Sequence, residues 1–119
     1  MPATLAYEPN DICVLNVSGI WKRSEMDVLQ DELAHKIVAG ARPRLLAVLQ
    51  DFEGWEKNVD WNEFDFLFAY SDKVQRIAIV AERQWEVQAL AFAGAGVRPA
   101  RVRFFLPDEI QPARAWLAE

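Results

Sequence analysis

Short apolar runs alternate along the chain with segments in which apolar residues recur every three or four positions. Runs that are apolar at nearly every position are typical of β-strands covered on both faces, whereas the longer spacing is typical of amphipathic helices. The segment Leu45–Leu49 is apolar throughout, which places it at the centre of a sheet. The runs predict five strands: Leu5–Glu8, Ile12–Val17, Leu45–Leu49, Val74–Ala81 and Arg101–Phe105.

A segment whose apolar residues recur at helical spacing follows each of the last four predicted strands. In the first helix we expect Ser24 to cap the N-terminus with Asp27 completing a capping box, and Gly40 to end the helix. The apolar stripe of this helix consists of Met26, Leu29, Leu33 and Ile37. The remaining helices are predicted over Trp61–Tyr70 (with Asp60 as N-cap), Gln84–Ala93 and from about Glu109 to Ala118.

The lengths of the connections set the topology. Pro9–Asp11 is a three-residue turn, which can join only antiparallel strands, whereas strands separated by helices require right-handed parallel crossovers. We therefore predict one α/β domain over residues 1–119, with strand and helix order ββαβαβαβα. Its mixed five-stranded sheet is mostly parallel, its first strand is antiparallel, and about four helices flank it.

Composition narrows the function classes. The 119 residues are 52% hydrophobic and 12% aromatic, enough for one core, and the net charge of -5 disfavours nucleic-acid binding. For Arg101 and Arg103, with the nearby Arg98, we favour a solvated face over an anion site. No secretory signal is visible and Val87–Val97 is too short to span a bilayer, so we expect a cytoplasmic protein without a transmembrane segment. Peripheral membrane contact stays open.

The residues that could carry chemistry are few. Cys13 lies in an apolar strand and is expected to be buried and inert, and His35 is expected to be exposed on its helix. No metal-ligand spacing, phosphate loop or nucleophile motif is present, so we predict no metal, no cofactor and no catalytic set. Asp51 and Glu53, in a loop expected from Asp51 to Asp60 at the carboxyl end of the third strand, could form an acid/base pair; the simpler interpretation is a braced turn and a solvated carboxylate.

Aromatic side chains gather after the third strand. Seven of them fall within twenty residues, more than a helix packed on one side of a sheet needs. Three interpretations stay open: the rings fill the core, they bind a hydrophobic ligand, or they form a homodimer or partner interface. The seven are Phe52, Trp55, Trp61, Phe64, Phe66, Phe68 and Tyr70.

Several motifs carry a family resemblance that spans nearly the whole chain. They are Leu49–Trp55, Trp61 with Phe64, Arg76–Val80 with Trp85, and Val102–Phe105 followed by Ala113, Ala115, Trp116 and Leu117. Together they resemble the bacterial SpoIIAA-like family, which shares the fold of STAS domains and has been grouped with Sec14-type lipid-binding domains. The resemblance implies the fold predicted above and allows lipid binding.

One departure bears on function. Anti-sigma antagonists of this fold carry a phosphorylatable Ser or Thr at the start of the helix after the third strand, and Asp51–Phe64 contains neither. A phosphorylation switch there is therefore disfavoured. We predict a non-enzymatic binding or regulatory module for a hydrophobic small molecule, a lipid or a protein partner, the alternative being an enzyme using Asp51 and Glu53. The expected binding residues are Asp51, Phe52, Glu53, Trp55, Trp61, Phe64, Phe66 and Tyr70.

Overall fold

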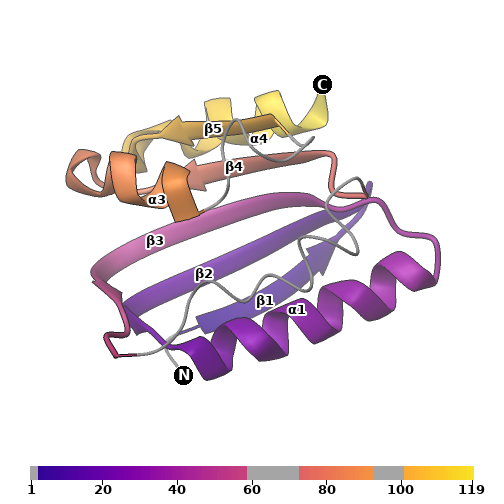
Figure 1. Ribbon diagram of the computed structural model, residues 1–119. Helices are drawn as coiled ribbons and strands as arrows, with labels where there is room; N and C mark the ends of the chain where they lie inside the picture. Colours follow the sequence, from indigo (N-terminus) through magenta and orange to yellow (C-terminus); the bar gives the residue numbers. More distant parts are fainter. Residues whose placement is uncertain (1–2, 59–72, 93–100) are drawn as a thin grey trace.

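A computed structural model of the chain describes residues 3–58, 73–92 and 101–119, and its five strands form one sheet in the order β1-β2-β3-β4-β5 (Figure 1). β1 pairs antiparallel with β2, and every other neighbouring pair is parallel. This confirms the predicted mixed sheet with an antiparallel first strand. The strands are β1 (Ala3–Glu8), β2 (Ile12–Trp21), β3 (Arg44–Trp55), β4 (Arg76–Val80) and β5 (Arg101–Phe105).

The described residues contain three α-helices, one fewer than the four we expected. The expected helix over Trp61–Tyr70 falls outside the described residues. Two of the helices are preceded by single 3-10 turns, Arg83–Trp85 and Pro107–Glu109. The helices are α1 (Arg23–Val38), α3 (Glu86–Phe92) and α4 (Ile110–Ala118).

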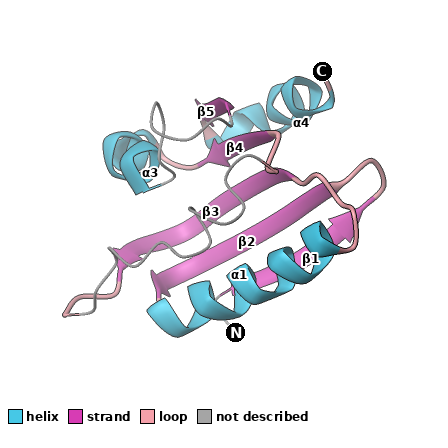
Figure 2. Ribbon diagram, turned by 45° about the vertical axis from the view of Figure 1, so that its right-hand side comes forward, coloured by secondary structure: helices cyan, strands magenta, loops and turns pink. Residues whose placement is uncertain are grey.

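Alternating side chains divide the interior into two cores, one on each face of the sheet. Figure 2 shows the sheet together with the helices that pack on it. Leu29 and Leu33 of α1 pack on one face, and Ala113 and Leu117 of α4 pack on the other. We call these the α1 face and the α4 face. In α4, Pro112 lies in the first turn, where its missing N–H leaves no intrahelical bond unmade.

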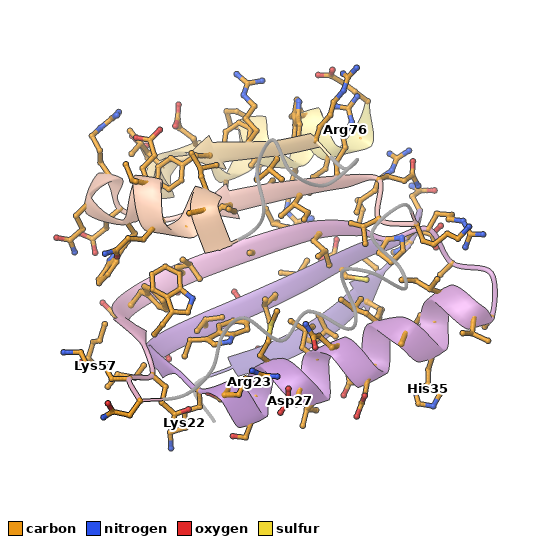
Figure 3. The ribbon with its side chains drawn as sticks, in the orientation of Figure 1. Lys22, Arg23, Asp27, His35, Lys57 and Arg76 are labelled. Carbon is orange, nitrogen blue, oxygen red and sulfur yellow. The ribbon has the colours of Figure 1, made fainter. Side chains whose placement is uncertain are left out.

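The predicted cap of α1 is wrong. The helix begins at Arg23, one residue before Ser24, and the backbone N–H of Lys22 donates to Glu25 Oε1 at 3.1 Å. The N–H of Arg23 donates to Glu56 Oε1 at 2.9 Å, which ties the start of the helix to the chain just after β3. Asp27 instead accepts from the guanidinium of Arg23 at 3.0 Å (Figure 3).

The predicted loop after the third strand is also wrong over its first five residues. β3 continues to Trp55, because two β-bulges absorb the residues that suggested a turn. From the pair Val17–Leu49 to the pair Gly19–Phe52, β3 uses one residue more than β2. A second extra residue of β3 lies between Phe52 and Gly54, where β2 goes directly from Gly19 to Ile20. Asp51 (φ 54°) and Gly54 (φ 113°) take the left-handed conformations that these bulges require.

Candidate functional site

The bulged end of β3 presents neighbouring residues to different surroundings. Phe52 is buried in the core of the α1 face and Trp55 packs partly against the same core. Asp51 is exposed and lines a groove on the α4 face, while Glu53 is exposed with its Oε2 close to Gly19. The structure therefore separates the two carboxylates from the aromatic residues with which the sequence groups them. Trp61, Phe64, Phe66 and Tyr70 lie outside the described residues, as does Phe68.

Three rings pack edge to face on the α1 face, in the geometry that aromatic quadrupoles favour. Phe52 lies between two indoles, with ring centroids 4.9 Å from Trp55 and 5.0 Å from Trp85. The centroids of Trp55 and Trp85 are 6.1 Å apart. Trp85 also packs over the backbone of Gly54, where an added Cβ would lie in ordinary van der Waals contact with the indole at 3.6 Å. We call Phe52, Trp55 and Trp85 the aromatic triad.

Beside the triad is a partly open cavity of about 110 Å³. Sheet residues of β2, β3 and β4 form its floor, and α1 and α3 contribute walls. Among the described lining residues, Gln30 and the indole N–H groups of the two tryptophans are the polar groups. None of the described lining residues is ionisable. The lining consists of Leu15, Trp21, Met26, Leu29, Gln30, Leu33, Leu45, Ala47, Leu49, Phe52, Trp55, Ile77, Ile79 and Ala89.

Apart from Phe52 and Trp55, the residues that line this cavity are not among the binding residues that the sequence predicts. Trp21 ends β2 and pairs with Trp55, so the second bulge of β3 determines which residues meet there. The proximity of Trp85 to Phe52 could have been predicted, because neighbouring parallel strands end at the same edge of a sheet. Val48 of β3 pairs with Val80 of β4. Phe52 follows Val48 at a distance along the chain similar to that at which Trp85 follows Val80. The contributions of Met26, Leu29 and Leu33 were predicted only as core.

The remaining sequence predictions concern reactive groups. Cys13 is 3% exposed, and burial raises the pKa of its thiol to about 11, so it stays protonated and inert near neutral pH, as expected. His35 is exposed and points away from the sheet (Figure 3). Arg101 and Arg103 are exposed on β5, in agreement with a solvated face. Within the described ranges, no three His, Cys, Asp or Glu side chains are grouped to hold a metal ion.

On the α4 face, an open groove of about 720 Å³ runs beside α4. A paired ion bridge crosses it, with Arg114 Nη1 and Nη2 donating to the two carboxylate oxygens of Glu8 at 2.9 and 3.2 Å. The hydrogen bond from Arg114 lowers the pKa of Glu8. Asp51 and Glu82 line the same groove and both are exposed. The groove thus carries charged side chains among its lining residues, whereas the described lining of the cavity on the α1 face has none.

Among the helices that the structure describes, none combines the length and hydropathy needed to cross a membrane. Comparison with curated proteins finds no significant match. Among solved structures, the chain is similar to an uncharacterized protein of the DUF3478 family with a SpoIIAA-like fold from Shewanella loihica PV-4, at a TM-score of 0.67 and 15% sequence identity. That likeness covers 97% of this chain and 91% of the other, and it shows the shared fold. The SpoIIAA-like family model matches residues 12–118, so the chain belongs to the SpoIIAA-like family.

Proposed function

We propose that this protein is a non-enzymatic binding module whose cavity on the α1 face accepts a hydrophobic group of a small molecule or lipid. The observation that carries the proposal is the cavity itself, which combines apolar walls with access from outside. Ligand sites are concave, mostly apolar and supplied with few polar groups. Gln30 is the polar side chain in position to orient a ligand at this site.

The size of the cavity limits what fits. An engineered cavity of roughly 150 Å³ in an unrelated protein binds benzene. At about 110 Å³, the cavity here has room for a ring or a short stretch of an acyl chain, with the rest of the ligand outside. Burying one methylene group contributes about 0.8 kcal/mol, so several buried carbons give useful affinity.

The residues that line the cavity also favour binding over catalysis. General acid/base chemistry needs an ionisable group within hydrogen-bond reach of the reacting atoms. The described lining supplies none, and Asp51 and Glu53 are both exposed outside it. No observation favours the alternative of an enzyme built on these two carboxylates.

A cavity-filling variant tests the proposal. Titration with the neutral fluorescent probe N-phenyl-1-naphthylamine should give saturable binding to the wild type. Ala47→Phe places a ring in the cavity and should abolish saturation, whereas Ala115→Phe, on the exposed side of α4, should leave it unchanged. The pair Asp51→Asn and Glu53→Gln should also leave it unchanged.

Absence of saturable binding to the wild type would contradict the proposal, as would equal binding by Ala47→Phe. Native mass spectrometry of the purified protein complements the titration, because a retained small molecule would identify the ligand. Loss of that mass in Ala47→Phe would assign the ligand to the cavity.

A further inference from the structure

The outer edge of β1 has no partner strand within the part of the chain that the structure describes. Among the described strands, β1 is the first of the sheet and pairs with β2 alone (Figure 1). In an antiparallel pair, alternate residues direct their N–H and C=O groups away from the partner strand. A free edge of this kind is a template for pairing with another chain.

The two edges of the sheet differ in how they discourage such pairing. β5, at the opposite edge, carries Arg101 and Arg103, both exposed, and charged side chains on an edge strand disfavour association. β1 has no charged residue from Ala3 to Tyr7, no proline within the strand and an unbroken register with β2. Glu8, at its end, is held by Arg114.

Apolar groups are exposed along the same edge. Tyr7 is 41% exposed and Val28, on α1, is 59% exposed. A groove of about 320 Å³ separates β1 from α1, and Leu5, Val28 and Leu29 are among its lining residues. The unpaired backbone edge is thus continuous with unburied apolar surface.

We propose that β1 pairs antiparallel with β1 of a second copy, around a twofold axis through Ala6, so that two sheets join into one of ten strands. This register is self-complementary. Leu5 lies opposite Tyr7 on the α1 face, an aliphatic–aromatic pair of the kind that stabilises antiparallel strands. Thr4 lies opposite Glu8 on the other face, where a hydroxyl can donate to a carboxylate.

The groove beside β1 fits this arrangement. In each chain Tyr7 donates to Glu32 and lies beneath Lys36, so its ring is held next to the groove, and Leu5 of the second copy would cover it there. Residues exposed in one chain would then be buried in both. The interface is isologous, the arrangement found in most soluble homodimers.

Charge substitution at the axis tests the register. Ala6 is exposed and would face its own copy across the axis, so Ala6→Glu and Ala6→Lys each place like charges opposite one another. Sedimentation velocity should show a wild-type dimer and a Kd at least tenfold higher for either variant. An equal mixture of the two variants should recover association, and native mass spectrometry should show the mixed dimer, which also proves that both variants are folded.

Val28→Glu provides an independent test, because it introduces a charge into the groove beside Glu32. Its matched control is Val87→Glu on α3, where Val87 is 80% exposed. The first should weaken the dimer and the second should not. A wild-type protein that stays monomeric at the highest soluble concentration would overturn the proposal, as would a dimer that neither Ala6 charge weakens. Neither outcome bears on probe binding at the cavity, so the two proposals fail separately.

Discussion

The guanidinium of Arg44 donates from Nη1 to the carbonyl oxygen of Leu117 at 2.9 Å. Arg76, which is labelled in Figure 3, makes the equivalent bond to the carbonyl oxygen of Trp116 at 2.8 Å. Its guanidinium also stacks over the Trp116 ring. These two arginines, paired across β3 and β4, satisfy carbonyls at the C-terminal end of α4. They also complement the negative end of the helix dipole.

We therefore expect Arg76→Ala to destabilise the fold. The hydrogen bond, the dipole interaction and the stacking together contribute about 1–3 kcal/mol. Urea denaturation should show this loss, and Arg83→Ala should cost less than about 0.5 kcal/mol, since its ion pair with Glu86 is exposed. Equal losses in the two variants would contradict the role of Arg76 at the end of α4.

Leu117 anchors α4 in the core of its face. It is 0% exposed, so Leu117→Ala should lower the free energy of unfolding by about 2–5 kcal/mol through lost burial and a residual cavity. Val87→Ala, at an exposed position, should change it by no more than about 0.5 kcal/mol. Thermal and urea unfolding both measure the difference, and a small effect at Leu117 would mean that α4 is not packed as described.

Stability should fall in alkaline solution. Burial raises the pKa of Cys13 from 9.0 to about 11 and that of Tyr7 from 10.0 to about 12. Above pH 9 the unfolded chain releases the thiol proton first, so the folded state binds more protons and the free energy of unfolding declines as pH rises toward 11. Cys13→Ala should flatten this decline. Urea titrations at stepped pH provide the measurement, and an identical slope in the variant would contradict the assignment.

The opposite sign applies to Glu8. Its pKa is lowered by the hydrogen bond from Arg114, so the pair stabilises the fold above the ordinary carboxyl range. That contribution is lost as the pH falls through the lowered pKa. Glu8→Gln should therefore lose less stability on acidification than the wild type does. Urea titrations at stepped acidic pH measure the two slopes, and equal slopes in Glu8→Gln and the wild type would contradict this role of the pair.

The sequence predicted the sheet because its inner strands β3 and β4 contribute to the cores on both faces and therefore read as apolar runs. It failed at β3, where Asp51 and Gly54 are turn formers that the structure uses in bulges within a strand. It also failed at the start of α1, where the groups that bind the first N–H groups are Glu25 and the distant Glu56. The sequence suggests a local cap at Ser24, but it does not indicate the hydrogen bond from Arg23 to Glu56, because these residues are 33 positions apart.

The candidate site was predicted only in part for a related reason. Phe52 and Trp55 were grouped because they sit close together in sequence, and in the structure their rings pack edge to face. Trp21 and Trp85 join them through strand pairing and the bulges, which hydrophobic periodicity does not reveal. Asp51 and Glu53 were grouped with the rings because the segment was interpreted as one loop.

The side chains of β4 alternate between the two cores, and this alternation restricts the mutations that the strand can accept. Ile77 and Ile79 fill one core, and the smaller Ala78 and Val80 fill the other. Inserting or deleting one codon within this strand would exchange the two sets and put too much volume on one side and too little on the other. Substitutions there can be accommodated one at a time, but a change in length cannot, so the length of β4 should be invariant among natural variants of this protein.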